Sequence, residues 1–263
     1  MIYRYETHLH TCQGSACGRT PGREYVEKYR KLGYAGIFVT DHFFEGNCAV
    51  DRSLPWRDKV DAYMEGYRDA KREGDRVGFP VFFGIEQNYE GDEYLIYGVD
   101  AEFLYGNPEI ERWPRTELVR CVREYGGCVI QAHPFRERSY IDRIRLFPCG
   151  VDGVEAVNMG NRPEEDALAL RYARRLNLPA TAGSDNHCAD KMTEDNVCAT
   201  GTTRPIVSER DFARYVRGRE PLFLCAPDGR GEWAEGTAPT LPVDVLDAES
   251  RVVGHDANTD IRA

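Results

Sequence analysis

The histidines of this chain lie at the ends of apolar runs, and this placement limits the folds that the chain can adopt. The chain has six histidines in 263 residues. Five of them, all except His255, lie in short motifs beside an apolar stretch, and so does Glu86. In an α/β barrel the carboxyl ends of the strands meet at one rim, where functional side chains collect. The pattern therefore predicts an α/β barrel with one rim site, formed by His8, His10, His42, Glu86, His133 and His187.

The first two histidines provide the local geometry of that site. His8 and His10 are two residues apart and follow a segment, Tyr3 to Tyr5, that is rich in strand-forming residues. On a strand, such residues point to the same face, with Cα atoms about 6.5–7 Å apart. Two imidazoles placed in this way are expected to bind one metal ion from the same side.

Strands and helices are expected to alternate along the chain, which is typical of a parallel α/β sheet. After the first strand, apolar runs predict strands at residues 35–40, 81–85, 94–99, 128–132, 151–157 and 179–182. Helical spacing of apolar residues predicts helices at 23–32, 56–76, 114–125, 139–147, 163–176 and 208–217. Residues 1–225 are predicted to form the barrel. Residues 226–263, rich in Pro, Gly and acidic residues, are predicted to form an extension with a hairpin within 240–253 and a frayed tail that carries a solvated His255.

Composition narrows the classes of partner. The net charge of −10 argues against a protein that coats nucleic acid or binds a membrane surface. Nine cysteines without a CxxC pair, no apolar signal-peptide core at the start and no run of membrane-spanning length favour reduced thiols in the cytoplasm. The sequence does not indicate an oligomeric state.

Five motifs together resemble the PHP (polymerase and histidinol phosphatase) family of metal-dependent phosphoesterases. They follow the order of the family and span Tyr3 to His187. The resemblance implies a distorted (βα)7 TIM-like barrel with two or three divalent metal ions at its C-terminal rim. The motifs are His8-Leu9-His10-Thr11, Thr40-Asp41-His42, Gly84-Ile85-Glu86, Ala132-His133-Pro134 and Gly183-Ser184-Asp185-Asn186-His187.

The resemblance also implies how the ligands are shared. A first ion would be held by His8, His10, Glu86 and Asp185. Glu86 would bridge to a second ion bound by His133, and a third ion would be held by His42 and His187. Imidazole and carboxylate ligands suit Zn, Mn or Fe(II).

Two departures from the family pattern affect this set. Many members place a His or Asp a few residues after the opening pair, where this chain has Ser15-Ala16-Cys17, so Cys17 is a candidate thiolate ligand. Many members also supply a further His before the Ala-His-Pro motif, but residues 89–100 contain none. The second ion is therefore expected to lack a ligand, which leaves either two ions or three with one weakly held.

The expected chemistry is attack on phosphorus by a water whose pKa the metal ions lower to about 7. Asp185 is a candidate proton acceptor as well as a ligand. Guanidinium groups match phosphate oxygens bidentately. The candidates for substrate binding are therefore Arg136 and Arg138, just after His133, with Arg19 and Arg162 on other predicted rim loops.

Hydrolysis of a small phosphate monoester, from a phosphorylated metabolite or a nucleotide, is the predicted function. A nuclease that trims short oligonucleotides with the same centre is the first alternative, and it requires a basic or aromatic track. A non-catalytic, metal-binding regulatory module and a hydrolase of C–N bonds are the others. No membrane partner is expected.

Overall fold

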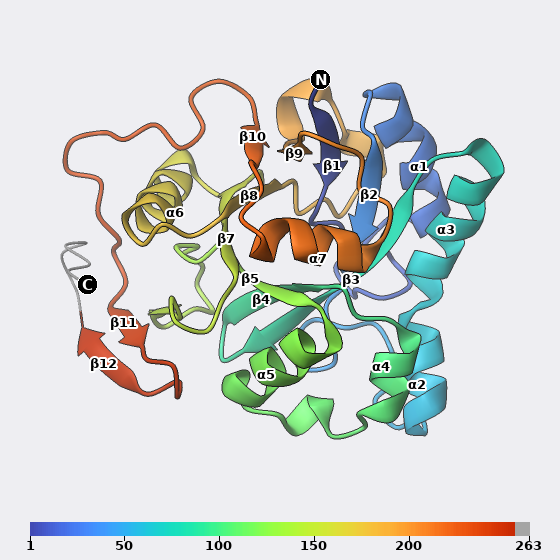
Figure 1. Cartoon of the computed structure of the whole chain (residues 1–263), viewed down its shortest axis with the longest axis horizontal. Helices are drawn as coiled ribbons and strands as arrows, with labels where there is room; N and C mark the ends of the chain where they lie inside the picture. The colour runs from blue at the N-terminus through green and yellow to red at the C-terminus, as the bar shows by residue number, and fades with distance from the viewer. Residues whose placement is uncertain (256–263) are drawn as a thin grey trace.

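A nine-stranded sheet forms the centre of the computed structural model, which describes residues 1–255 (Figure 1). Its strands are β1 (Tyr3–Glu6), β2 (Gly36–Val39), β3 (Val81–Tyr89), β4 (Asp92–Tyr97), β5 (Cys128–Ala132), β7 (Gly153–Asn158), β8 (Ala180–Gly183), β9 (Ala199–Thr202) and β10 (Phe223–Cys225). They are hydrogen-bonded in the order β10-β9-β1-β2-β3-β4-β5-β7-β8. The two end strands, β8 and β10, contact each other, so the sheet curls into a nearly closed barrel.

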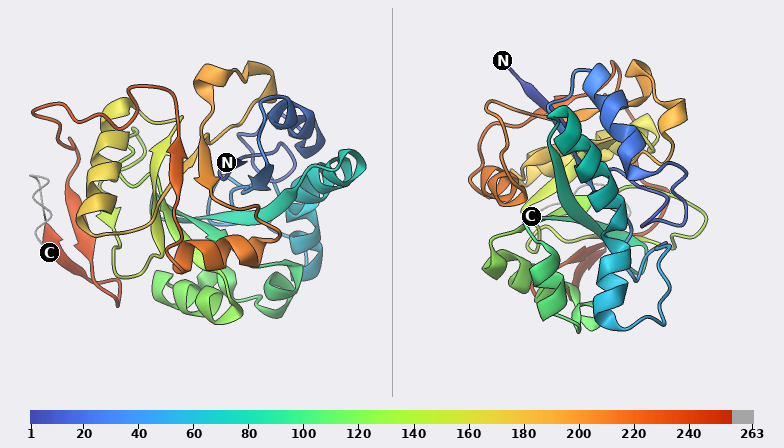
Figure 2. Two further views of the ribbon diagram at one scale, coloured as in Figure 1. Left: turned by 45° about the horizontal axis from the view of Figure 1, so that its top comes forward. Right: turned by 90° about the vertical axis from the view of Figure 1, so that its right-hand side faces the viewer.

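Helices surround this barrel (Figure 2). They are α1 (Gly22–Lys31), α2 (Trp56–Tyr63), α3 (Glu65–Val77), α4 (Ala101–Gly106), α5 (Arg115–Tyr125), α6 (Pro163–Arg175) and α7 (Glu209–Arg217). The pair α1 and α3 pack on each other beside β2 and β3, α5 packs on β5, and α6 covers β7. The predicted α/β barrel class is confirmed.

Helix α7 crosses β3, β4 and β5 and fills one end of the barrel (Figure 1). Ser208 caps the helix by accepting a hydrogen bond from the Asp211 amide. Phe212 then packs between the interior rings of Phe38 and Tyr97, with ring centroids 4.8 and 5.0 Å apart. Because this end is filled with apolar side chains, the polar residues gather at the opposite rim.

The expectation of a parallel sheet was wrong at β4 and also at β9, which pairs antiparallel with β1 and β10. The parallel pairs are β1–β2, β2–β3, β5–β7 and β7–β8, but β4 pairs antiparallel with both β3 and β5. Strand β3 also continues to Tyr89, so Glu86 lies inside this strand and pairs with Leu95 of β4. The start of β4 therefore lies at the same rim as the ends of the parallel strands.

Two predicted helices were also wrong in part. The expected helix at 56–76 is divided at Met64 into α2 and α3. Gly66, just after the break, lies against Thr11, where a Cβ would be 2.0 Å from the Thr11 hydroxyl oxygen. The segment 139–147 is not a helix. Ile144 and Leu146 are both buried, and this two-residue spacing belongs to strand β6 (Ile144–Leu146).

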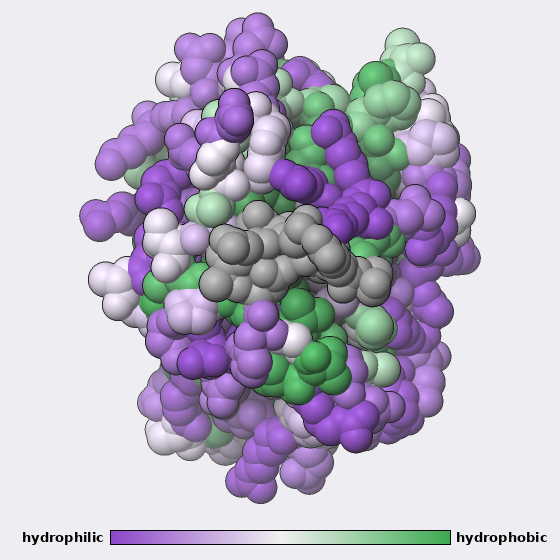
Figure 3. Space-filling view, turned by 90° about the vertical axis from the view of Figure 1, so that its left-hand side faces the viewer, coloured by the Kyte–Doolittle hydropathy of each residue, from purple (hydrophilic) through white to green (hydrophobic). Residues whose placement is uncertain are grey.

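Strand β6 joins the C-terminal extension to the barrel domain. It pairs in parallel with β11 (Val243–Leu246), which pairs antiparallel with β12 (Val252–His255). Figure 3 shows this end of the molecule as largely hydrophilic, with hydrophobic areas between the hydrophilic ones. On β12, the hydrophobic side chains of Val252 and Val253 are exposed. The tail expected to fray continues beyond His255 into residues outside those described. Within residues 1–255, no helix is long and apolar enough to span a membrane.

Candidate metal centre

Four buried side chains meet at the rim in the first part of the centre. His8 Nε2 lies 3.0 Å from Glu86 Oε1 and 3.1 Å from His10 Nε2. Asp185 Oδ1 lies 3.1 Å from His10 Nε2. Zinc bonds to such ligands are about 2.0–2.2 Å long, which sets tetrahedral ligand atoms about 3.4 Å apart. The ligand atoms of His8, His10 and Asp185 lie within 4.8 Å of one another, as do those of His8, Glu86 and His133, so each trio has the spacing of a metal site and the two trios share His8.

Each imidazole of this group is oriented by a partner on its other nitrogen. His8 Nδ1 lies 2.9 Å from Glu155 Oε1, and His10 Nδ1 lies 3.0 Å from Ser15 Oγ. The Ser15 hydroxyl in turn donates to Asp41 Oδ1 at 2.7 Å. Because a carboxylate only accepts hydrogen bonds, His8 donates from Nδ1, and its Nε2 lone pair points into the centre. Sequence reasoning missed Glu155, which has no motif and is buried within β7.

A second group surrounds the other side of Glu86. His133 Nε2 lies 3.2 Å from Glu86 Oε1 and 3.5 Å from Glu93 Oε2. His42 Nδ1 lies 2.7 Å from Glu86 Oε2, yet neither atom has a hydrogen-bond partner within residues 1–255, although both are buried. Buried polar atoms without partners are rare. These two fit a cation shared between them.

Glu93 lies beside the second group, for which the sequence predicts one ligand too few. It was overlooked because in a parallel strand the start of β4 would lie at the far rim. Since β4 runs antiparallel, Glu93 pairs with Ala132, directly before His133. Its carboxylate also accepts a hydrogen bond from Asn88 at 3.1 Å. The only sequence signal for the antiparallel direction of β4 is that the segment from Asp92 to Tyr97 starts with polar residues and ends with apolar ones.

The third group is more open. Nitrogen atoms of His10, His42 and His187 lie within 4.8 Å of one another. The side chain of His187 is 29% exposed, whereas that of His10 is buried. Cys17 lies beside this group. Burial raises the pKa of the thiol, but hydrogen bonds with His187 and His42 outweigh that effect and lower the pKa to about 6. A thiolate is therefore accessible at neutral pH.

The charges of the first two groups stabilise one another. Burial raises the pKa of Glu86, but His8 and His42 outweigh it and hold the pKa well below its usual range. Burial also opposes the ionised form of Asp185, but His8 and Arg136 hold its pKa well below normal. These carboxylates are ionised near neutral pH, as metal ligands must be.

Two of the converging residues have unusual backbone conformations. His133 has φ 28° and Asp185 has φ 53°, in the left-handed region that side-chain-bearing residues seldom occupy. Such strain costs on the order of 1–3 kcal/mol per residue and clusters at functional sites. His133 directly follows β5 and Asp185 comes two residues after the end of β8, so the surrounding sheet holds them in place.

Three of the four arginines predicted to bind substrate are instead paired with carboxylates. Arg136 Nη2 lies 2.7 Å from Asp185 Oδ2. Arg138 Nη1 lies 3.0 Å from Glu165 Oε1, and Arg162 Nη2 lies 3.0 Å from the same oxygen. Because their charge is balanced within the protein, these arginines orient Asp185 and the start of α6.

Arg19, the fourth, lines a cleft beside the third group. The cleft has a volume of 350 Å³ and is lined by Arg19, Met159, Gly160, Ser184, Asp185, Asn186, His187, Cys188, Lys191 and Asn196. Within the described chain, neither Arg19 nor Lys191 forms an ion pair. Sequence reasoning missed Lys191 because it lies on a short 3-10 helix outside every motif.

The C-terminal extension reaches the centre through a chain of hydrogen bonds. Arg230 Nη1 donates to Asp166 Oδ2 at 3.0 Å, and Asp166 Oδ1 accepts from Asn161 Nδ2 at 3.0 Å. Asn161 Oδ1 accepts from Arg136 Nε at 2.9 Å. Since Arg136 contacts Asp185, the extension supports a candidate metal ligand.

Comparisons with known proteins agree with this fold. A family model described as PHP-associated matches residues 163–221. A two-domain protein from Bacteroides vulgatus, containing a predicted PHP-like metal-dependent phosphoesterase, superposes with a TM-score of 0.59 at 13% identity, over 86% of this chain and 65% of that one. The predicted resemblance to the PHP family is confirmed.

Two further similarities are to a phosphodiesterase and to an endonuclease. Phosphoribosyl 1,2-cyclic phosphate 1,2-diphosphodiesterase from Eggerthella lenta is 33% identical over 79 residues, which cover 30% of this chain and only 30% of that protein. A lesion-specific endonuclease from Pyrococcus furiosus superposes with a TM-score of 0.54 at 10% identity, over 85% of this chain and 58% of that one. The likeness to the solved structures establishes the α/β barrel fold and leaves the substrate open.

Proposed function

We propose that this PHP-like protein is a metal-dependent phosphoesterase that hydrolyses a small phosphate monoester, from a phosphorylated metabolite or a nucleotide. The observation that carries the proposal is the convergence of overlapping groups of candidate ligands beside a cleft whose two cations form no ion pair within residues 1–255. Divalent ions in such a centre lower the pKa of water to about 7 and neutralise phosphate oxygens. The ligand set suits Zn, Mn or Fe(II), as two or three ions.

Asp185 is assigned here to ligand binding rather than to proton transfer. Arg136 holds its Oδ2, and its Oδ1 faces His10 in the first group. A general base works best with a pKa near the operating pH, and that of Asp185 is held well below normal. Its side chain would therefore hold an ion of the first group at the edge of the cleft.

Arg19 and Lys191 are assigned to the substrate phosphate. Both are exposed, both line the cleft next to Asp185 and His187, and both are free of carboxylate partners within residues 1–255. Guanidinium and ammonium groups are the usual partners of phosphate oxygens. Arg136 and Arg138, the stronger candidates from sequence, are less suited to this role because their carboxylate partners already balance their charge.

A nuclease remains the second candidate function. The similarity in fold to the Pyrococcus furiosus endonuclease supports it, as does the exposed ring of Tyr140. The charges of Glu93 and Arg136 act on the Tyr140 hydroxyl, so this ring lies near the centre. Exposed aromatic rings near such a site suit base stacking.

The test is a hydrolysis screen of the purified protein with Mn, Zn or Fe(II). The substrates are an aryl phosphate, an aryl phosphodiester, nucleoside monophosphates and short oligonucleotides, with an anilide to test C–N hydrolysis. Monoester turnover that stops on chelation supports the proposal, and preferential oligonucleotide cleavage supports the nuclease. A metal-loaded protein that hydrolyses none of these supports the regulatory alternative.

The role of the cleft is tested separately. Arg19→Ala and Lys191→Ala are expected to raise the KM for the phosphate ester at least tenfold, with metal content unchanged. Arg112→Ala, an exposed arginine on the 3-10 helix Ile110–Arg112, is the matched control. Unchanged KM in both cleft variants would reject this assignment.

A further inference from the structure

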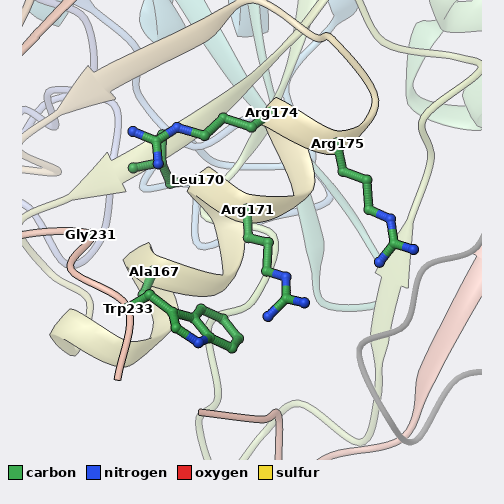
Figure 4. Close-up of a pocket in the computed structure, with 7 residues that line it drawn as sticks. All are labelled: Ala167, Leu170, Arg171, Arg174, Arg175, Gly231 and Trp233. Carbon is green, nitrogen blue, oxygen red and sulfur yellow. The ribbon is translucent and has the colours of Figure 1, made fainter. Parts of the chain in front are cut away.

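A second cleft lies between helix α6 and the segment 231–233 of the C-terminal extension (Figure 4). Its volume is 580 Å³, within the range of small-molecule sites. It is lined by Ala167, Leu170, Arg171, Arg174, Arg175, Gly231 and Trp233, and none of these is acidic. None of them belongs to the three groups of the metal centre.

The cleft is a local concentration of positive charge on an acidic protein. Arg171 and Arg174 form no ion pair within the described residues, whereas Arg115 and Arg120 pair with carboxylates at 2.6 Å. Basic residues in the last turn of a helix also stabilise the helix dipole, which by itself would explain arginines at this position. It would not explain an aromatic ring placed among them.

Trp233 supplies that ring. It is 43% exposed, and the Arg171 guanidinium lies 4.2 Å from its ring centroid. Figure 4 shows the indole in front of α6, next to Arg171, with Ala167 beside it. Gly231 has φ 73° and lies close to Leu170, so the segment approaches the helix and leaves the indole at the edge of the cleft.

We propose that this cleft binds a nucleotide unit. The base would stack on the surface formed by Trp233 and the guanidinium of Arg171, and the phosphate would bind Arg174. Stacking of a base on an aromatic side chain contributes about 1–3 kcal/mol, and an arginine fork matches phosphate oxygens. The apolar Leu170 and Ala167 form the remaining wall. The proposal is independent of the metal centre and of the reaction proposed there.

Tryptophan fluorescence of the full-length protein tests this proposal. The ligands are adenosine 5′-monophosphate, adenosine, inorganic phosphate and an eight-nucleotide oligo(dA). We expect saturable quenching by the mononucleotide that is absent in Trp233→Phe. We also expect at least tenfold weaker binding in Arg171→Gln and Arg174→Gln. If oligo(dA) binds more tightly than the mononucleotide, the nucleotide unit belongs to a polymer. If the two bind equally tightly, the unit is a free nucleotide.

Arg57→Gln is the matched control, because Arg57 also lies 4.2 Å from a ring, that of Tyr105, but outside the cleft. It should bind the mononucleotide like the unchanged protein. Thermal melting of each variant checks its folding. Absence of quenching by both the mononucleotide and oligo(dA) would overturn the proposal. So would equal affinity for phosphate and the mononucleotide, or unchanged affinity in both arginine variants.

Discussion

The first and third groups of the metal centre differ in how firmly their side chains are held. In the first, His8 and Asp185 each have a dedicated partner, Glu155 at 2.9 Å and Arg136 at 2.7 Å. In the third, His187 Nδ1 lies 2.8 Å from the Asp185 carbonyl oxygen, within its own loop, and the ring is partly exposed beside the cleft lined by Arg19 and Lys191.

This difference suggests a division of labour. A ligand set that is fixed before binding loses little conformational freedom when the ion enters, so the first group should bind most tightly. The open group gives up affinity but borders the cleft that holds Arg19 and Lys191. The ion in the third group is therefore expected to be the most exchangeable and the closest to substrate.

The largest effect is expected from Glu86→Ala, because this carboxylate belongs to two groups at once. The variant should lose ions from both and reduce hydrolysis of the phosphate ester by more than about 100-fold, beyond the range seen for outer partners of ligands. Metal analysis and initial rates are the measurements. His187→Ala is the comparison, and it should lose at most one ion.

The Glu155→Gln variant tests the importance of the partner of His8. Loss of the charged acceptor should weaken metal binding by about 10–100-fold, as for other carboxylate partners of metal-binding histidines. Competition with a chelator of known affinity measures the change. Glu117→Gln, an exposed carboxylate on α5, is the control. Equal affinities in the two variants would show that preorganisation of the first group is unimportant.

The Arg230→Met variant tests the support from the C-terminal extension. Asp166 is fully buried, so removal of its partner should destabilise the protein by about 3 kcal/mol. It should also lower metal affinity modestly through Asn161 and Arg136. Chemical unfolding with and without metal separates the two effects. Arg251→Met, whose partners lie on the exposed turn before β12, should change neither quantity.

The smallest effect is expected from Cys17→Ser, since Cys17 is a candidate ligand of the open group alone. The variant should keep the ions of the first two groups and bind zinc less well at the third, because a hydroxyl is a poorer zinc ligand than a thiolate. Cobalt substitution reports the change, since loss of a thiolate–cobalt charge-transfer band would mark the ligand. Identical spectra for the two proteins would remove Cys17 from the centre.

Sequence reasoning succeeded where a ligand follows its own buried strand. His42 and His133 are such cases, because a short apolar run and the residue after it define both the strand and its rim. The same reasoning explains why α7 was found, with Ser208 as its cap.

Sequence reasoning failed where the position of a residue depends on strand direction, or where its role depends on a partner far away in the sequence. Glu93 reaches the centre only because β4 is antiparallel, and Glu155 is recognisable only through its contact with His8, 147 residues away. The carboxylate partners of Arg136 and Arg138 lie on later segments of the chain, so the sequence could not show that their charges are already balanced.

Anomalous diffraction from crystals grown with manganese or zinc tests the central claim most directly. The account predicts peaks within bonding distance of His8, His10, Glu86 and Asp185, and between Glu86, Glu93 and His133. The peak beside His42 and His187 should be the weakest. A protein that is active on the phosphate ester while this volume contains no anomalous peak would contradict the account.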